Sequence, residues 1–464
     1  MSLHSTDSAP VASRMKPFDL FTVSDEERAR AAAHAKFAAA QATHIPDIPA
    51  GTPLRPIRRV AVIGAGTMGG GIAMALANIG IPVALIDAAA PGLERGLARV
   101  KDNYAGSVSR GKLTQAQMDE RLALIIGSLR MEDAADADLI IEAVFEDMPL
   151  KQDIFRRLDA IARPGAILAT NTSGLDVDEI AAVTLRPQDV VGAHFFSPAH
   201  VMKLLEVVRA ARTAPDVIAT LMDLGRRMGK IAVLARIYPG FIGNALFRNY
   251  TREAHFLVED GALPHEVDAA LKKFGYAMGI FAVHDMAGND VGYQTRKAQM
   301  ATRPNDRRWN DLILKLCDQG RLGQKSGKGW YRYEKGDRTP HRDPELEQFI
   351  IEESARMGIE RRPMDDTEIL KRCLYGMVNE GARLLEKGIA LRPSDIDITY
   401  LTGYGFPAHH GGPMYMADRI GLAHVLADIR RLHANYGYWW QPAPLLEQLV
   451  REGRTFADLQ KAAV

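Results

Sequence analysis

The sequence predicts an α/β domain with a doubly wound, mostly parallel β-sheet, followed by two related all-α domains. Between Val60 and Arg236, short β-branched runs alternate with longer segments of helical periodicity, which is typical of βαβ units. A glycine-rich GxGxxG motif directly follows the first of these runs. Beyond Pro239 the pattern is helical and partly repeats itself. The predicted domains, after an N-terminal extension at residues 1–56, span residues 57–236, 237–336 and 340–464.

The composition excludes several classes of protein. A chain of 464 residues that is 47% hydrophobic can bury a large core. Its 58 Lys and Arg balance 57 Asp and Glu, so no basic surface for nucleic acid is expected. Two cysteines without a CxxC pair predict neither a disulfide framework nor a metal site.

No membrane insertion or targeting is expected from the sequence. An apolar stretch between Arg59 and Asp87 carries no charge, but its glycines and Pro82 divide it into strand, helix and strand. The first 20 residues lack the apolar run of a signal peptide, and the last three are not Ser-Lys-Leu. These features predict a cytoplasmic protein.

The N-terminal extension combines a polar segment, a helix and a linker. Residues 1–22 are polar and irregular. A capping box from Ser24 to Glu27 then predicts a helix at about 24–41. Recurring prolines between His44 and Pro56 predict an extended linker.

Seven apolar runs are the candidate strands of the first domain. They lie at residues 60–64, 82–87, 138–144, 166–171, 190–196, 204–208 and 231–235. The fifth and sixth runs are too close for a crossover helix between them. One of these two strands should therefore run antiparallel at the end of the sheet.

The GxGxxG motif predicts a dinucleotide site. Gly64 permits a tight turn, Gly66 lets the backbone approach a pyrophosphate, and Gly69 allows close packing of helix and strand. Thr67 and Met68 lie between them in the first turn of the helix. Asp87 ends the next strand, 23 residues after Gly64, where its carboxylate would bind both ribose hydroxyls and repel a 2′-phosphate. The cofactor predicted is NAD, and an FAD enzyme with the same motif is the minor alternative.

Further polar residues follow the third and fourth runs. Glu142, Glu146 and Lys151 lie near the end of one, and Asn171 to Ser173 at the end of the other. Strand carboxyl ends in this fold face the ligand crevice. Taken alone, each charge is more often a solvated loop residue than a ligand.

The strongest catalytic candidates are His194 and Glu206, which lie in the two closely spaced runs. If these strands are neighbours, the carboxylate can bind one imidazole nitrogen and stabilise the imidazolium that forms when the other accepts a proton. A glutamate flanked by Leu-Leu and Val-Val is otherwise expensive to bury. A lone histidine would more often be a core residue, but this partner favours catalysis.

The helical part contains an internal repeat. Helices are expected at 241–260 and 264–274. The segment 256–276 is echoed at 383–405, and MAGNDVG at 286–292 is echoed by MADRIGL at 416–422. Two related helical modules that pack against each other are therefore predicted.

Several motifs, in order from about Val23 to the end, resemble the (S)-3-hydroxyacyl-CoA dehydrogenase family of fatty-acid β-oxidation. They are VAVIGAGTMGGGIA, IIEAVFED, ATNTSGL, GAHFFSPAHVMKLLEVV, YPGFIGN, GQKSGKGWY and YGFPAHHGGPM. More narrowly, the chain resembles the dehydrogenase half of the bifunctional enoyl-CoA hydratase/3-hydroxyacyl-CoA dehydrogenases. This resemblance implies NAD-dependent oxidation of (S)-3-hydroxyacyl-CoA to 3-ketoacyl-CoA.

The resemblance also implies roles for single residues. His194 would be the general base and Glu206 its electrostatic partner, while Ser173 and Asn244 would bind substrate oxygen. Ser197 stands where a frequent form of the family has Asn, and no role is assigned to it. The implied NAD site adds Glu146, Lys151, Ser173 and Lys325 to the glycine motif.

The resemblance has two implications for organisation. Relatives with one helical module dimerise, so residues 340–464 would replace a partner subunit and leave the protein a monomer. Bifunctional relatives carry a hydratase where this chain has only about 22 residues, so no hydratase activity is expected.

Two other functions stay open on the sequence alone. One is a hydroxyacid dehydrogenase that acts on a small substrate without CoA. The other is an NAD-binding structural or sensor protein without chemistry.

Overall fold

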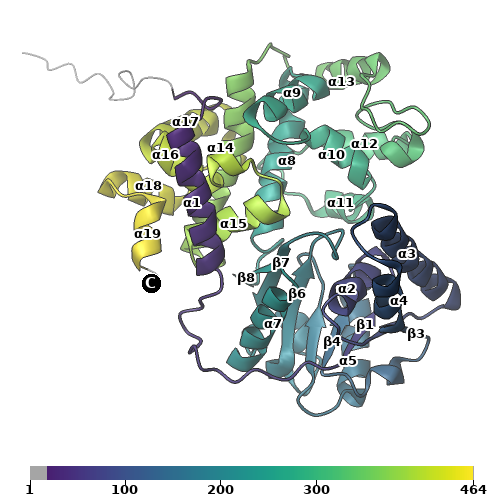
Figure 1. Cartoon of the computed structure of the whole chain (residues 1–464). Helices are drawn as coiled ribbons and strands as arrows, with labels where there is room; N and C mark the ends of the chain where they lie inside the picture. Colours follow the sequence, from purple (N-terminus) through teal and green to yellow (C-terminus); the bar gives the residue numbers. More distant parts are fainter. Residues whose placement is uncertain (1–17, 463–464) are drawn as a thin grey trace, which may run out of the picture. The chain divides into compact units, whose positions relative to one another are not determined.

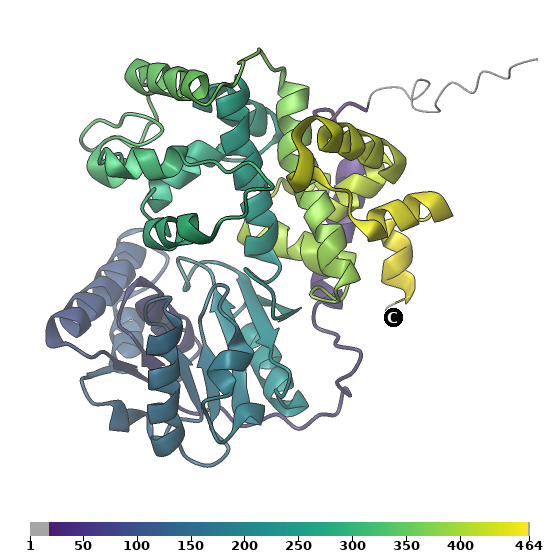
Figure 2. The same cartoon turned by 180° about the vertical axis from the view of Figure 1, so that it is seen from behind.

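The computed structural model describes residues 18–462, and the predictions made for residues 1–17 lie outside the described residues. The described chain forms two compact units. The sheet unit comprises residues 34–245, 387–404 and 460–462, and the helical unit comprises residues 18–33, 246–386 and 405–459. Figures 1 and 2 show the ribbon from opposite sides.

The sheet unit is built on a twisted sheet, in which eight strands lie within the described residues. The strands are β1 (Val60–Ile63), β2 (Val83–Ile86), β3 (Ile125–Ser128), β4 (Leu139–Glu142), β5 (Ile167–Thr170), β6 (Val190–Phe195), β7 (Leu204–Arg209) and β8 (Ile231–Arg236). Their order is β3-β2-β1-β4-β5-β6-β7-β8. The predicted doubly wound, mostly parallel sheet is confirmed.

Two details of the sheet differ from the prediction. Strand β7 runs antiparallel to β6 as expected, but it is not the edge, because β8 follows it in parallel. The connecting helix α7 (Pro215–Arg227) is a crossover, which keeps the direction of the strand. The sequence prediction also missed the edge strand β3, where Ile126 is 65% exposed and the apolar run is short.

Helices pack on both faces of the sheet. The helices of this unit are α2 (Thr67–Ala77), α3 (Ala90–Ser109), α4 (Gln115–Ala123), α5 (Met148–Ile161), α6 (Val177–Ala181), α7 and α15 (Pro393–Gly403), with 3₁₀ turns η2 (Met131–Ala134) and η3 (Pro187–Asp189). Alternate strand residues such as Val62 and Ala193 join Ile72 of α2 and Leu221 of α7 in one core. On the opposite face, a Cβ on Gly192 would lie 3.4 Å from Val177 of α6.

The helical unit contains the two copies of the predicted repeat, apart from α15. Its helices are α8 (Gly243–Asp260, whose first turn belongs to the sheet unit), α9 (Pro264–Phe274), α10 (Ile280–Ala287), α11 (Tyr293–Gln299), α12 (Leu312–Asp318), α13 (Pro344–Arg356), α14 (Asp366–Glu386), α16 (Pro413–Ile420), α17 (Leu422–Tyr436), α18 (Pro444–Glu452) and α19 (Phe456–Ala462). Its 3₁₀ turns are η4 (Met300–Thr302), η5 (Gln324–Ser326), η6 (Ala408–His410) and η7 (Gly437–Trp440). Among residues 18–462, none of the helices is both long and apolar enough to cross a bilayer.

Helix α1 (Asp25–Gln41) begins at the predicted capping box. The backbone N–H and the hydroxyl of Ser24 donate to Glu27, and the Glu27 N–H donates back to the Ser24 hydroxyl. The proline-rich linker then follows α7, where Arg55 binds Asp216 and Asp189.

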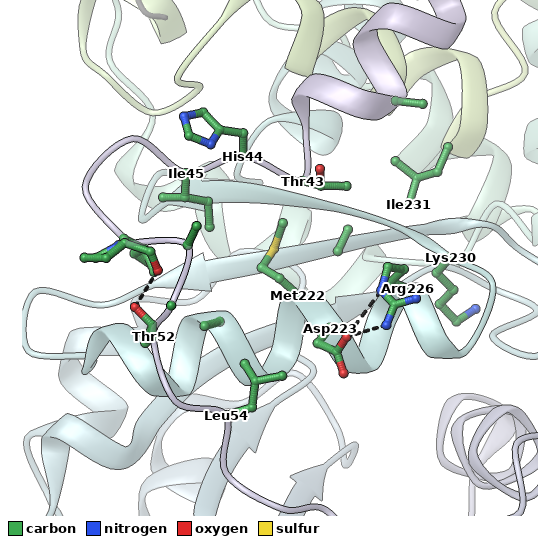
Figure 3. A pocket seen from close by; sticks show the side chains of 17 residues that line it. Thr43, His44, Ile45, Thr52, Leu54, Met222, Asp223, Arg226, Lys230 and Ile231 are labelled. Atoms are coloured by element: carbon green, nitrogen blue, oxygen red, sulfur yellow. Dashed lines mark hydrogen bonds and ion pairs between the residues drawn. The ribbon is translucent and has the colours of Figure 1, made fainter.

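A groove of about 560 Å³ lies between this linker and α7 (Figure 3). His44, Ile45 and Leu54 of the linker line it on one side, and Met222 and Arg226 of α7 on the other.

The buried His255 and the half-buried His284 lie side by side in the helical unit. Burial lowers the pKa of His284 to about 3 and the pKa of His255 well below its ordinary value. Their rings lie 5.3 Å apart, and His255 also stacks on Trp330. Nδ1 of His284 and Nε2 of His255 have no hydrogen-bond partner in the described part of the chain.

The stability of the protein should therefore fall in acid. Below pH ~6.5 these histidines bind protons in the unfolded protein but not in the folded protein. Each histidine can therefore lower the free energy of unfolding by up to ~1.4 kcal/mol per pH unit. This loss of stability continues as the pH falls, until the pH reaches the pKa of the histidine in the folded protein. Burial raises the pKa of Glu259 to about 7 and that of Asp268 to about 6, which acts in the opposite direction.

A variant isolates the histidine contribution to this acid sensitivity. The free energy of unfolding of His284→Phe should fall less between pH 7 and pH 5 than that of the wild type, measured by urea titration. Replacement of the exposed His433 by phenylalanine is the control. Equal slopes for His284→Phe and the wild type would contradict the prediction.

Candidate active site

The glycine loop after β1 has the geometry that a dinucleotide requires. Gly64 has φ +102°, and a Cβ there would lie 2.8 Å from the carbonyl oxygen of Ala143. A Cβ on Gly69 would lie 1.8 Å from the carbonyl oxygen of Gly64, so only glycine lets α2 pack on the turn. Gly66 differs, because a Cβ there would meet nothing within 4 Å. The space above Gly66 is therefore open to a ligand.

The start of α2 and the end of β2 complete this part of the site. Among the described residues, no side chain caps α2 at its N-cap Gly66. The backbone N–H groups of the first turn, at Thr67 and Met68, are therefore available to a ligand. Asp87 follows β2, is half-buried, and accepts hydrogen bonds from the N–H groups of Ala65 (2.9 Å) and Ala89 (3.1 Å). These contacts fix the carboxylate beside the glycine turn. An open backbone cradle with a fixed carboxylate next to it fits NAD.

Replacing Gly66 by alanine should separate ligand binding from folding. The free energy of unfolding should stay within about 1 kcal/mol of the wild type, because only the N-cap preference changes. The Kd for NADH should rise about tenfold or more, since the methyl group occupies the approach of the pyrophosphate.

The matched control for this variant is Gly69→Ala. It should destabilise the fold by about 1–3 kcal/mol through overpacking. Unchanged NADH affinity in Gly66→Ala, measured by fluorescence titration, would place the dinucleotide elsewhere.

The charges after β4 form a buried network rather than a solvated loop. Glu142 and Lys151 are both 0% exposed, and the Lys151 Nζ lies 2.7 Å from Glu142 Oε1. The Thr170 hydroxyl donates to the other oxygen of Glu142. The general expectation that a lone charge is solvated does not hold for these two residues, because each neutralises the other inside the sheet unit.

Glu146 links this network to the end of β5. Its Oε2 lies 3.6 Å from the Lys151 Nζ, and its Oε1 accepts from the N–H (2.8 Å) and hydroxyl (3.0 Å) of Ser173. The hydroxyl of Thr172 donates to the same oxygen. Glu146, Lys151 and Ser173 thus lie together at the carboxyl ends of β4 and β5.

His194 and Glu206 face each other across the antiparallel pair β6–β7. They are direct register partners, and His194 Nδ1 lies 2.7 Å from Glu206 Oε2. Glu206 is 0% exposed and His194 is 6% exposed. The ring of His194 contacts Phe196 at 4.4 Å and Phe241 at 5.8 Å between centroids. With Nδ1 bound to the carboxylate, Nε2 is the nitrogen available to a substrate.

The backbone at the start of α8 completes the environment of Glu206. Its Oε1 accepts from the N–H groups of Ile242 (3.2 Å) and Gly243 (2.9 Å). These donors and the positive end of the helix dipole favour a negative charge there. Phe241 adopts φ +51°, a left-handed conformation that is costly for an aromatic residue. Sequence reasoning missed these donors, although the Gly-Phe-Ile-Gly run after Pro239 marks an unusual turn.

Asn244 and Ser173 are brought together beside this pair. The Asn244 Nδ2 lies 3.4 Å from the carbonyl oxygen of Ser173. Asn171 accepts a hydrogen bond from the Phe195 N–H at 2.8 Å, which fixes the end of β5 against β6. Both polar residues that the resemblance assigns to substrate are therefore in the same compact unit as His194.

Lys325 lies in the helical unit. It is on η5, where its Nζ is 2.5 Å from Asp290 Oδ1. The loop around it is built on Asp285, whose carboxylate accepts from the N–H groups of Trp330 and Tyr331.

A doubly wound sheet with an open glycine turn, a fixed acidic residue after β2 and a buried His–Glu pair defines a dinucleotide-binding dehydrogenase. The chain belongs to the 3-hydroxyacyl-CoA dehydrogenase family. The family's NAD binding domain matches residues 59–237, and its C-terminal domain matches residues 240–333 and 369–461.

Individual relatives agree with this assignment. The chain is 45% identical over 413 residues to the peroxisomal bifunctional enzyme of Danio rerio, covering 86% of this chain and 57% of the relative. It thus spans a little over half the length of that relative. Among solved structures it is similar to (S)-3-hydroxybutyryl-CoA dehydrogenase PaaH1 from Ralstonia eutropha, with 33% identity, a TM-score of 0.55, and coverage of 60% and 100%.

Two longer solved chains are also similar. 3-Hydroxybutyryl-CoA dehydrogenase from Escherichia coli K12 has a TM-score of 0.73 and 29% identity, with 86% of this chain and 99% of that chain covered. The dehydrogenase part of multifunctional enzyme 1 from C. elegans has a TM-score of 0.65 and 29% identity, with coverage of 92% and 98%.

The prediction of a cytoplasmic protein is contradicted by these comparisons. The relative from Danio rerio is named as a peroxisomal enzyme, as are further relatives from animals and plants. These names point to peroxisomes, and the prediction had rested only on the lack of a recognisable signal.

Proposed function

We propose that the protein oxidises (S)-3-hydroxyacyl-CoA to 3-ketoacyl-CoA with NAD, in the manner of fatty-acid β-oxidation. The observation that carries the proposal is the buried His194–Glu206 contact at 2.7 Å beside Asn244 and Ser173. Membership of the family and its NAD binding domain support the choice of substrate class and cofactor.

The proposed chemistry follows from the donors and acceptors of the site. Glu206 accepts the Nδ1–H of His194, so Nε2 carries a lone pair toward the substrate. Nε2 takes the proton of the 3-hydroxyl group as the C3–H bond breaks and C3–O becomes a carbonyl. NAD, when bound, accepts the hydride from C3. The proton remains on His194, where Glu206 stabilises the imidazolium.

The surroundings of Glu206 suit this role. Two backbone N–H groups hold Oε1, so the carboxylate stays in place while the charge of His194 changes. Ser173 and Asn244 would orient the substrate oxygen, so that C3 and Nε2 meet in one geometry.

A direct assay tests the substrate class. NADH oxidation should be fast with acetoacetyl-CoA and at least about 10²-fold slower with free acetoacetate, because CoA contacts contribute binding energy to the chemical step. Equal rates would favour a hydroxyacid dehydrogenase on small substrates. No turnover of either substrate, with NADH still bound, would favour a structural or sensor protein.

We further propose that the chain corresponds to the dehydrogenase half of a bifunctional enzyme and is a monomer. The duplicated match to the family's C-terminal domain supports the two predicted helical modules, and the name of the C. elegans structure supports the dehydrogenase half. Light scattering should give the mass of one chain, 51.0 kDa. A stable dimer, or hydration of crotonyl-CoA by the chain, would overturn this part.

A further inference from the structure

We propose that Tyr404, at the end of α15, is a positioning residue that fixes the side-chain amide of Asn244 for the substrate. The inference rests on the proposed function, because it assigns Asn244 to the substrate oxygen. Tyr404 comes from the second copy of the helical repeat, yet it belongs to the sheet unit.

The first observation is a direct hydrogen bond. The Tyr404 hydroxyl donates to Asn244 Oδ1 at 2.7 Å. The side-chain amide of an asparagine can flip by about 180° with little change in shape. Its hydrogen-bond partners therefore decide which side carries the NH₂ group. With Oδ1 engaged by a hydroxyl, the NH₂ group is turned to the side of Ser173. It is then a donor on the side where the substrate oxygen is proposed to lie.

The second observation is that Tyr404 is packed against residues that surround the His194–Glu206 pair. A Cβ on Gly243 would lie 2.4 Å from the Tyr404 ring, so glycine is required there. The Tyr404 ring meets Phe196 edge-on at 5.5 Å, and Phe196 lies 4.4 Å from His194. The hydroxyl is thus held by a ring that is itself fixed by the residues around the base.

The third observation is that α15 is anchored to the sheet independently of Tyr404. The Arg236 N–H donates to the Ile389 carbonyl oxygen, and a Cβ on Gly403 would lie 2.4 Å from Leu204 of β7. Tyr400, one turn earlier, stacks on Tyr404 at 4.7 Å and donates to the Gly243 carbonyl oxygen at 3.1 Å. The helix therefore presents Tyr404 from a rigid support.

The repeat shows that the two tyrosines are specific to this copy. The offset between Pro264 and Pro393 places Leu271 and Gly275 of the first copy at the positions of Tyr400 and Tyr404, and the offset between the motifs at 286 and 416 places Ala270 and Phe274 there. With either offset, the first copy has no hydroxyl group at these two positions. A residue that is needed only for the fold of the helical module would be expected at the same position in both copies. The tyrosines occur in the copy whose second helix lies in the sheet unit.

The test is a double-mutant cycle with acetoacetyl-CoA and NADH. Tyr404→Phe should lower kcat/KM for acetoacetyl-CoA about tenfold, the value of one hydrogen bond, while the KM for NADH stays unchanged. In an Asn244→Ala background the same substitution should have almost no further effect. Tyr404→Phe should also leave the apparent pKa of the pH–rate profile unchanged, because no proton passes through the tyrosine.

Two control variants identify a merely structural effect. Tyr400→Phe removes the neighbouring hydroxyl, and its effect should persist in the Asn244→Ala background. Tyr104→Phe removes a buried hydroxyl that binds Asn78 between α2 and α3, and its kinetics should match the wild type. Additive effects of Tyr404→Phe and Asn244→Ala, or a wild-type kcat/KM in Tyr404→Phe, would overturn the inference.

A measurement without turnover separates this inference from the proposed function. The side-chain amide resonances of Asn244, assigned by their loss in Asn244→Ala, should shift or broaden in Tyr404→Phe and stay in place in Tyr104→Phe. An inactive wild type would overturn the proposed function alone. Unshifted amide resonances in Tyr404→Phe would overturn the positioning role, whatever the activity.

Discussion

Replacement of His194 by glutamine should lower kcat for acetoacetyl-CoA reduction by about 10²–10⁴-fold, the usual contribution of a general acid or base. Glutamine fills similar space but cannot exchange a proton at neutral pH. The Kd for NADH should stay within about twofold, because the glycine turn and Asp87 are untouched. Stopped-flow measurement of NADH consumption gives the rate, and fluorescence titration gives the affinity.

The control for this variant is a histidine outside the pair. His44 is exposed on the linker, and His44→Gln should behave as the wild type. A kcat within threefold of the wild type in His194→Gln would remove His194 from the mechanism.

Replacement of Glu206 by glutamine should have the second largest effect, a fall in kcat of roughly 10²–10⁴-fold. One oxygen of Glu206 binds His194 and the other binds two backbone N–H groups, so both oxygens must be acceptors. Glutamine supplies only one acceptor. Its NH₂ group must therefore face either Nδ1–H or the N–H groups of α8.

The pH–rate profile shows whether the loss is electrostatic. Without the carboxylate, the imidazolium that forms during the reaction is less stable, so the pH–rate profile of Glu206→Gln should differ from that of the wild type. Circular dichroism should show a retained fold. A rate and a pH–rate profile equal to those of the wild type would mean that the pair does not act as proposed.

Much of the sheet unit was predictable because local patterns determine it. The glycine turn and the pairing of His194 with Glu206 follow from a short motif and from the close spacing of two apolar runs. In the helical unit, the start of α1 after Ser24 likewise follows from its capping box. Strand β3 was missed because its run is short and lies at an edge, where half of the alternating pattern is solvent-exposed.

Contacts between distant segments were not predictable from the pattern. Nothing in the local sequence shows that Glu142 and Lys151 are buried as an ion pair. The predicted packing of the second copy on the first is confirmed, for example where Arg372 binds Asp260, but α15 belongs to the sheet unit and reaches Gly243 and Asn244. Contacts between distant segments determine both the buried ion pair and the position of α15, and the periodicity of a single helix does not predict such contacts.

The central claim is that this site removes a hydride from C3 and a proton from the 3-hydroxyl group of an (S)-3-hydroxyacyl-CoA. A single-turnover experiment with excess protein, NAD and each enantiomer of 3-hydroxybutyryl-CoA tests it most directly. The account predicts NADH formation from the (S) enantiomer, none from the (R) enantiomer, and a loss of the (S) signal in His194→Gln. NADH formation from neither enantiomer, or an undiminished rate in His194→Gln, would contradict it.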